Sequence, residues 1–156
     1  MKDFLIEQKN FLHETFAALS AMTDMETSSR ENGKWSKKEI LGHLIDSASN
    51  NHQRFVRAQF KDDLIFPGYD QDEWVRVQDY QSANWHSLLE LWKDFNFHII
   101  HLINRIPAEQ LTKKRIKHNL HQIASVEIPE SEPATLEYFI KDYYGHLRHH
   151  LKQILA

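Results

Sequence analysis

The sequence contains no cysteine, and this absence removes several classes of chemistry. Disulfide bridges, zinc sites built on thiolates and a cysteine nucleophile are all excluded. The common catalytic signatures are missing as well, namely the glycine-rich phosphate loops, the G-x-S-x-G nucleophile turn and the H-E-x-x-H zinc motif. Any metal site supplied by this chain must therefore use histidine or carboxylate side chains.

Long hydrophobic runs and an excess of positive charge are also absent. No apolar stretch reaches the roughly 18 residues of a membrane span, and no secretory signal is evident at the N-terminus. We therefore expect a cytoplasmic protein that does not enter membranes. A formal net charge of -3 gives no general attraction to nucleic acids or anionic membranes, so we expect neither as a partner.

Glycine and proline are scarce, with four of each, and the chain instead shows helical periodicity. Apolar residues recur at helical spacing in four stretches, at about 2–22, 36–60, 84–105 and 133–156. The absence of repeats and linkers predicts a single domain over residues 1–156. Four long helices predict an all-α four-helix bundle. Connections of about twenty residues after the second and third helices exclude a bundle joined only by short turns.

Shorter signals mark the helix boundaries. Ser36 and Glu39 have the spacing of a capping box, which predicts the start of the second helix. Asp70 is placed to cap a short helix within the long connection 61–81, and Pro107 to begin another. Residues 23–33 are polar and are predicted to form a loop.

Three histidines gather near the C-terminus. His146 and His150 are four residues apart and lie on one face of the predicted helix, a spacing that suits a shared metal ion. On a helical wheel His150 lies inside the apolar face and His146 at its edge, whereas His149 points away toward solvent. An imidazole ring within an apolar face needs a hydrogen-bond partner or a metal ion, so His146 and His150 are candidate metal ligands.

The second predicted helix carries a polar stripe beside its apolar face. The pattern alone favours a solvated face with weak side-chain pairs, and the alternative is the wall of a polar cleft. A further alternative places a metal site at the pairs His98–His101 and His118–His121. The residues of the stripe are Glu39, His43, Asp46, Ser47, Asn50 and Arg54.

Three segments resemble motifs of the DinB/YfiT-like superfamily. Residues 35–47 (WSKKEILGHLIDS), with Asn50 and Arg54 beyond them, are similar to its second-helix motif. Residues 66–74 (FPGYDQDEW) resemble the loop that follows, and residues 146–154 (HLRHHLKQI) resemble the last-helix motif. The resemblance extends over nearly the whole chain and implies a four-helix bundle with up-down-down-up topology.

The resemblance also implies a three-histidine metal site formed by His43, His146 and His150. Members of the family include transferases and isomerases that use bacillithiol, mycothiol or glutathione, and others described as metal-dependent hydrolases. We therefore expect a divalent transition ion (Zn, Ni or Fe), a small-molecule substrate and a thiol such as bacillithiol as cosubstrate. Asp46, Asn50 and Arg54 are candidates for orienting the ligands or the substrate. Relatives are commonly dimers, which makes a homodimer an expectation as well.

Two functional hypotheses follow. The first is a metal-dependent enzyme that activates a thiol or water, with thiol transfer favoured over hydrolysis. The second is a non-catalytic binding or stress-response protein in which the metal is structural. The motifs identify no general acid or base beside the three histidines.

Overall fold

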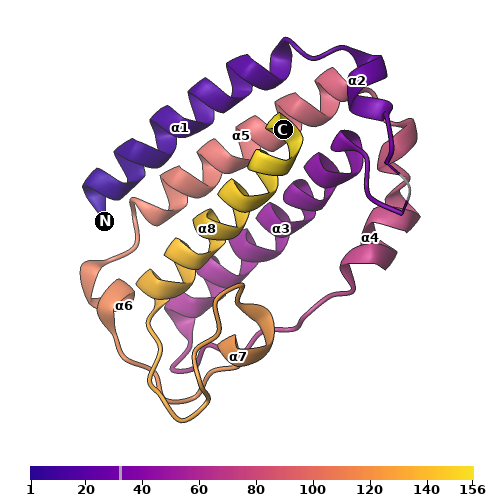
Figure 1. Cartoon of the computed structure of the whole chain (residues 1–156). Helices are drawn as coiled ribbons and strands as arrows, with labels where there is room; N and C mark the ends of the chain where they lie inside the picture. The colour runs from indigo at the N-terminus through magenta and orange to yellow at the C-terminus, as the bar shows by residue number, and fades with distance from the viewer. Residues whose placement is uncertain (32) are drawn as a thin grey trace.

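Four long helices form the body of the computed structural model, which describes residues 1–31 and 33–156. They are α1 (Lys2–Ser20), α3 (Lys37–Arg57), α5 (Trp85–Ile103) and α8 (Leu136–Leu155). Figure 1 shows α1 and α8 running in one direction and α3 and α5 in the other, an up-down-down-up topology. The described residues contain no strand beyond two isolated bridges, so the predicted all-α four-helix bundle is confirmed.

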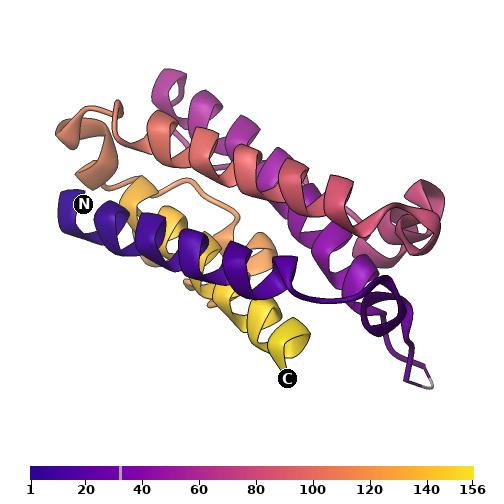
Figure 2. The ribbon, with the colours of Figure 1, turned by 90° about the horizontal axis from the view of Figure 1, so that it is seen from above.

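The arrangement of the helices explains the long connection between α3 and α5. α3 packs on α5 and α8, and α1 packs on the same two helices, so that α1 and α3 lie diagonally across the bundle. Seen from above, α1 and α8 lie on one side and α3 and α5 on the other (Figure 2). Because α3 and α5 are parallel neighbours, the chain between them must travel back over the roughly 30 Å length of a helix of this size.

Side-chain caps mark the starts of α3, α5 and α8. Ser36 accepts a hydrogen bond from the Glu39 N–H at 3.3 Å, and the Glu39 carboxylate accepts one from the Ser36 N–H at 2.8 Å. This confirms the predicted capping box of α3. The Asn84 side chain caps α5 by accepting from the Ser87 N–H, and the Thr135 hydroxyl caps α8 by accepting from the Tyr138 N–H. A 3₁₀ turn, η1 (Ala58–Phe60), follows α3 and accounts for the predicted extension of this helix to residue 60.

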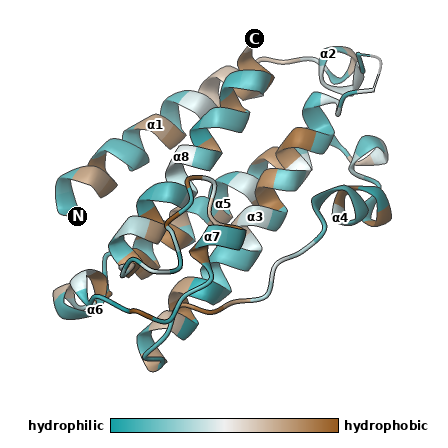
Figure 3. Ribbon diagram, turned by 60° about the horizontal axis from the view of Figure 1, so that its bottom comes forward, coloured by the Kyte–Doolittle hydropathy of each residue, from teal (hydrophilic) through white to brown (hydrophobic). Residues whose placement is uncertain are grey.

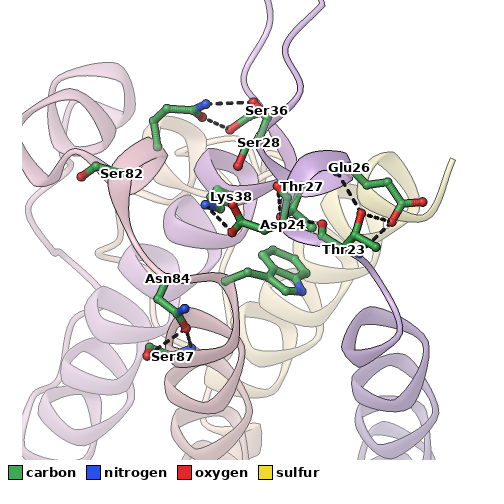
Figure 4. Close-up of polar contacts among 12 residues, drawn as sticks. Thr23, Asp24, Glu26, Thr27, Ser28, Ser36, Lys38, Ser82, Asn84 and Ser87 are labelled. Atoms are coloured by element: carbon green, nitrogen blue, oxygen red, sulfur yellow. Dashed lines mark hydrogen bonds and ion pairs between the residues drawn. The ribbon is translucent and has the colours of Figure 1, made fainter.

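One predicted loop is partly helical, which corrects the interpretation of residues 23–33. Thr23 and Glu26 form a second capping box, and it starts the short helix α2 (Asp24–Ser28). The Asp24 carboxylate lies 2.8 Å from the Lys38 ammonium, so α2 is tied to the start of α3 (Figure 4). Thr23 and Glu26 have the spacing of a capping box in the sequence, but no apolar run follows them, so helical periodicity does not indicate this short helix.

The remaining short elements lie in the two long connections. Asp70 caps α4 (Gln71–Gln78) as predicted, and the 3₁₀ turn η2 (Tyr80–Ser82) leads into α5. α6 (Ala108–Thr112) follows Pro107 as predicted, and α7 (Leu120–Ile123) comes before α8. In the described residues no helix is long and apolar enough to cross a membrane.

The core consists of the apolar faces of the four long helices. Brown apolar residues and teal polar residues alternate in bands along each of these helices in Figure 3, as expected for amphipathic helices that bury one face. The apolar face predicted for the last helix is buried throughout: Leu136, Phe139, Ile140, Tyr143, Leu147, Leu151 and Ile154.

The two long connections hydrogen-bond to each other. The Leu64 N–H donates to the Lys117 carbonyl at 2.9 Å, and the Asn119 N–H donates to the Leu64 carbonyl at 3.2 Å. The Asn119 side chain also accepts from the Phe66 N–H and donates to the Phe66 carbonyl, at 3.1 and 2.8 Å. These bonds satisfy the backbone of an irregular segment and fix the residues that follow it against α3.

Gly42 on α3 leaves room for the aromatic ring of Tyr80. A β-carbon at position 42 would lie 2.1 Å from a Tyr80 ring atom, far inside van der Waals contact. We expect Gly42→Ala to lower the free energy of unfolding, because overpacking of about 1–3 kcal/mol outweighs the roughly 1 kcal/mol gain in helix propensity. Urea denaturation of the two proteins measures the difference.

Gly145 on α8 is the matched control. A β-carbon at position 145 would meet nothing within 4 Å, so Gly145→Ala should be stabilising by about 0.5–1 kcal/mol. A Gly42→Ala protein that equals or exceeds the wild type in stability would contradict the close packing of Tyr80 on α3.

Candidate metal site

Three histidines from two antiparallel helices meet at one point. His43 lies on α3, and His146 and His150 lie on α8, which packs against α3. One ligand nitrogen from each ring can be chosen so that all three lie within 4.8 Å of one another. The Nε2 atoms of His43 and His146 are 3.3 Å apart. Within the described residues this is the one group of three or more candidate ligand side chains at such distances.

The three imidazoles are uncharged at neutral pH. Burial, followed by repulsion from the rings of His146 and His150, lowers the pKa of His43 to about 3. Burial also lowers the pKa of His146 to about 4 and lowers that of His150. An uncharged imidazole keeps a lone pair on one nitrogen, which is the form that binds a metal.

The geometry fits a divalent transition ion. A tetrahedral ion with bonds of about 2.0–2.1 Å to nitrogen separates two of its ligand atoms by about 3.3–3.4 Å. The 3.3 Å between His43 Nε2 and His146 Nε2 matches that spacing. Nδ1 of His43 is buried and has no hydrogen-bond partner among the described residues. Three neutral nitrogen donors suit zinc, nickel and iron alike.

Gln153 orients the third ring, a role that the sequence did not indicate. Its Oε1 lies 2.8 Å from His150 Nδ1, so this nitrogen carries the proton and Nε2 of His150 is left with the lone pair. The Gln153 amide nitrogen in turn donates to His149 Nε2 at 3.2 Å. His149 is exposed, as its position on the helical wheel predicted.

The polar stripe on α3 is buried, which corrects the favoured interpretation of a solvated face. Asp46 is 3% exposed, and its carboxylate accepts hydrogen bonds from the Tyr80 hydroxyl at 2.7 Å and from the Gln78 amide at 2.8 Å. Tyr80 and Gln78 belong to the connection after α3 and cover the stripe at Asp46. The second oxygen of Asp46 has no partner among the described residues, and burial raises the pKa of this carboxyl.

A pocket of about 200 Å³ opens between α3 and α8 and has His146 in its wall. Of the three residues predicted to orient ligands or substrate, Arg54 lines this pocket, whereas Asp46 and Asn50 do not. Asn50 is half-buried and donates to the Asp46 carbonyl within its own helix. The polar residues that the sequence did not single out for this wall are Asn51, Tyr69, Gln71, Gln122, Ser125 and Asp142.

Tyr69 and Asp142 reach the pocket through tertiary contacts. Burial raises the pKa of Tyr69 to about 12, so its hydroxyl is protonated at neutral pH. The Asp142 carboxylate accepts hydrogen bonds from the Ser125 and Val126 N–H groups, at 3.0 and 2.8 Å. These bonds fasten the connection before α8 to the helix that carries His146. A second, wider pocket of about 750 Å³ also has Ser125, Asp142 and His146 in its wall.

The other histidine pairs do not form a comparable group. Both ring nitrogens of His118 are engaged, since Nε2 lies 2.7 Å from the Glu132 carbonyl and Nδ1 accepts from the Leu120 N–H at 3.2 Å. His98 and His101 stack with ring centres 6.5 Å apart, and no third candidate ligand joins them among the described residues. The structure therefore offers no support for a metal site there.

Comparison with known proteins agrees with this arrangement. The sequence profile of the DinB superfamily matches residues 9–154. A protein of Halalkalibacterium halodurans named "putative metal-dependent hydrolase" is 24% identical over 143 residues, which are 92% of this chain and 75% of that protein. The "putative metal-dependent hydrolase YfiT" of Bacillus subtilis is 26% identical over 139 residues, 88% of this chain and 72% of that protein.

Solved structures show the same fold. The structure of YfiT from Bacillus subtilis, described as having an unusual four-helix bundle topology, superposes with a TM-score of 0.74 at 22% identity. The superposition covers 99% of this chain and 85% of that one. A mycothiol-dependent maleylpyruvate isomerase superposes with a TM-score of 0.61 at 10% identity, over 94% of this chain and 59% of that one.

Proposed function

Because this chain belongs to the DinB superfamily, we propose that it is a metal-dependent enzyme with His43, His146 and His150 as the ligands. The observation that carries the proposal is the meeting of three buried or half-buried uncharged imidazoles at one point. The relatives from Halalkalibacterium halodurans and Bacillus subtilis both carry the name "putative metal-dependent hydrolase", which supports a metal-dependent reaction. A pocket that reaches His146 supplies room for a small-molecule substrate.

The donor set determines what such a site offers. Three neutral ligands leave the charge of a divalent ion uncompensated, and the bound ion would lower the pKa of a thiol or water and polarise a substrate oxygen. The protein contributes the orientation of the rings. Gln153 holds the His150 ring with its Nε2 lone pair available.

The polar groups of the pocket favour a thiol over water as the nucleophile. Among the described residues that line it, Asp142 is the only carboxylate, and two backbone N–H groups already engage its oxygens. Water starts from a pKa of about 15.7 and gains most from a neighbouring base, whereas a thiol starts near about 8.5. We therefore propose that the sulfur of a low-molecular-weight thiol such as bacillithiol bonds to the electrophilic carbon of a small molecule and displaces its leaving group, while the thiol proton passes to solvent. Hydrolysis is the second candidate.

The test combines metal loading with a reaction screen. Untagged protein is prepared with Zn²⁺, Ni²⁺ or Fe²⁺ and incubated with bacillithiol, mycothiol or glutathione and a small electrophile such as a halobimane. We expect formation of the thioether that requires the ion, stops with a chelator and returns when the ion is restored. Ester and amide substrates without any thiol are assayed on the same preparation.

The outcomes separate the alternatives. Hydrolysis without thiol conjugation would establish the second candidate and overturn the first. Turnover of neither kind, together with a melting temperature that falls on metal removal, would indicate a structural metal in a non-catalytic protein. A protein that retains no stoichiometric divalent ion would remove the basis of the proposal.

A further inference from the structure

Arg54 is a buried cation without a carboxylate partner. Its side chain lies on α3 in the wall of the pocket, and the residue is only 7% exposed. In the part of the chain that the structure describes, no Asp or Glu oxygen lies within ion-pair distance of its guanidinium. Arg115, the other buried arginine without such a partner, instead donates to the Gln110, Lys113 and Ala58 carbonyls. A buried charge is costly unless it is paired, so an unpaired one in a pocket wall calls for an explanation.

The hydrogen bonds of Arg54 leave most of its donors free. One terminal nitrogen, Nη2, donates to the Pro67 carbonyl at 2.8 Å, and Nη1 lies 3.5 Å from the Asn51 side-chain oxygen. A guanidinium has five N–H donors in a planar fork that matches carboxylate and phosphate oxygens. The contact with Pro67 fixes the position of the side chain and uses only one of these donors.

No group in the pocket forms an ion pair with Arg54 among the described residues. Tyr69 is protonated, and the Asp142 carboxylate, on the other helix, is held by the Ser125 and Val126 N–H groups. The remaining polar groups of the wall, such as Ser47 and Gln122, are uncharged. At its α3 end the pocket therefore presents a guanidinium that no described carboxylate contacts.

Arg54 and His146 mark opposite ends of this pocket. The wall contributed by α3 extends from Ser47 to Arg54, and the wall contributed by α8 extends from Phe139 to His146. Because the two helices are antiparallel, Arg54 lies beside Phe139, with its guanidinium carbon 5.9 Å from the centre of that ring. Phe139 and His146 are seven residues apart, which is about 10 Å along the helix.

We propose that Arg54 binds the carboxylate or phosphate group of a small organic anion and holds its reactive end toward His146. The anion is a substrate or the thiol cosubstrate, and the inference rests on the proposed function for the metal at the His146 end. Recognition of one charged group at a fixed distance from the ion would select small acidic molecules over neutral ones of the same size.

Binding of simple probes to the protein tests this inference. ¹⁵N-labelled protein, with and without Zn²⁺, is titrated with succinate, inorganic phosphate and the neutral analogue succinamide, and the amide shifts of Gly68 and Ser125 are followed. We expect an anion to bind in both metal states and succinamide to bind at least tenfold more weakly. A charged hydrogen-bonded pair of about 1.5–3 kcal/mol corresponds to roughly 10–100-fold in affinity. Comparison of succinate with phosphate shows which anion the site prefers.

Variants on the same helix provide the controls. Arg54→Gln should weaken anion binding at least tenfold. Arg54→Lys keeps the positive charge and should bind the anion with an affinity between those of the wild type and Arg54→Gln. Arg54→Lys also serves as the test variant if Arg54→Gln does not fold. Arg57 is an exposed arginine that bonds only to Gln53 among the described residues, so Arg57→Gln should leave the titration unchanged. The inference is overturned if succinamide binds as well as succinate, or if anion binding is lost in His146→Ala and intact in the Arg54 variants. Metal analysis of the wild type and of each variant tests the proposed function separately. A protein that binds the anion but cannot be loaded with a divalent ion would overturn the proposed function and leave the role of Arg54 in place.

Discussion

Replacing His146 with alanine is expected to abolish stoichiometric binding of a divalent ion. His146 Nε2 lies 3.3 Å from His43 Nε2, and the third ring, His150, completes the group within 4.8 Å. Removal of one of three protein ligands should lower the affinity by more than the roughly 10–100-fold that loss of an outer hydrogen-bond partner costs. His43→Ala and His150→Ala should have the same effect. Elemental analysis and competition with a chromogenic chelator measure the affinity of untagged protein.

Neighbouring residues on α8 give graded controls for this result. His149→Ala removes an exposed imidazole three residues from His146 and should leave the stoichiometry unchanged. Gln153→Leu removes the acceptor that orients His150 and should weaken binding by about 10–100-fold without abolishing it. Full metal occupancy in His146→Ala, or loss of the metal in His149→Ala, would show that the ion is held elsewhere.

Lowering the pH below about 6.5 should reduce the free energy of unfolding of the metal-free protein, because two buried histidines stay uncharged in the folded state. The folded state keeps His43 and His146 uncharged, with pKa values of about 3 and about 4, whereas the unfolded chain protonates them near about 6.5. Below that pH the unfolded state binds more protons, so the free energy of unfolding falls as the pH falls. Each of the two groups contributes at most about 1.4 kcal/mol per pH unit, and the loss continues down to the folded pKa values.

Urea denaturation between pH 7.5 and pH 5 in the presence of a chelator measures this slope. His43→Gln removes one of the groups and should reduce the slope by about one proton, or about 1.4 kcal/mol per pH unit. Saturation with Zn²⁺ should raise the stability most at neutral pH, because protonation of the ligands competes with the ion. Equal slopes for the wild type and His43→Gln would contradict the uncharged, buried state of this ring.

The two connections carry the parts of the site that the helices cannot supply. The Asn119 side chain hydrogen-bonds to the backbone of Phe66. The carbonyl of the next residue, Pro67, accepts a hydrogen bond from the Arg54 guanidinium. On the α8 side Asp142 holds the backbone of Ser125 and Val126. Both connections thus border the pocket between α3 and α8 and enclose the groups that face it.

Local sequence signals predicted the helices because the physics behind them is local. Helical periodicity and the caps at Ser36, Asp70 and Pro107 depend on residues within about one turn of each other, and the structure confirms these starts. The same locality explains the distinction between His150 and His149 on α8. A pair at i and i+4 shares a face in any α-helix, whatever packs against it.

Long-range packing decided the rest. The polar stripe of α3 looked like a solvated face, and it is buried because the connection after α3 places Tyr80 and Gln78 on it. His43 is about a hundred residues from His146 in the chain, and only the family resemblance pointed to it before the structure placed their nitrogens 3.3 Å apart.

By itself, then, the sequence determined the four helices, their buried faces and the pair of histidines on the last one. The tertiary structure decided that a third imidazole joins them, that their burial keeps all three uncharged, and that Arg54 faces the same pocket with no ion-pair partner among the described residues. The physical reason is that burial and desolvation belong to the packed molecule. The pKa of a histidine and the cost of leaving an arginine without an ion pair both depend on how deeply the side chain is buried. That burial is set only when the surrounding helices and connections have packed.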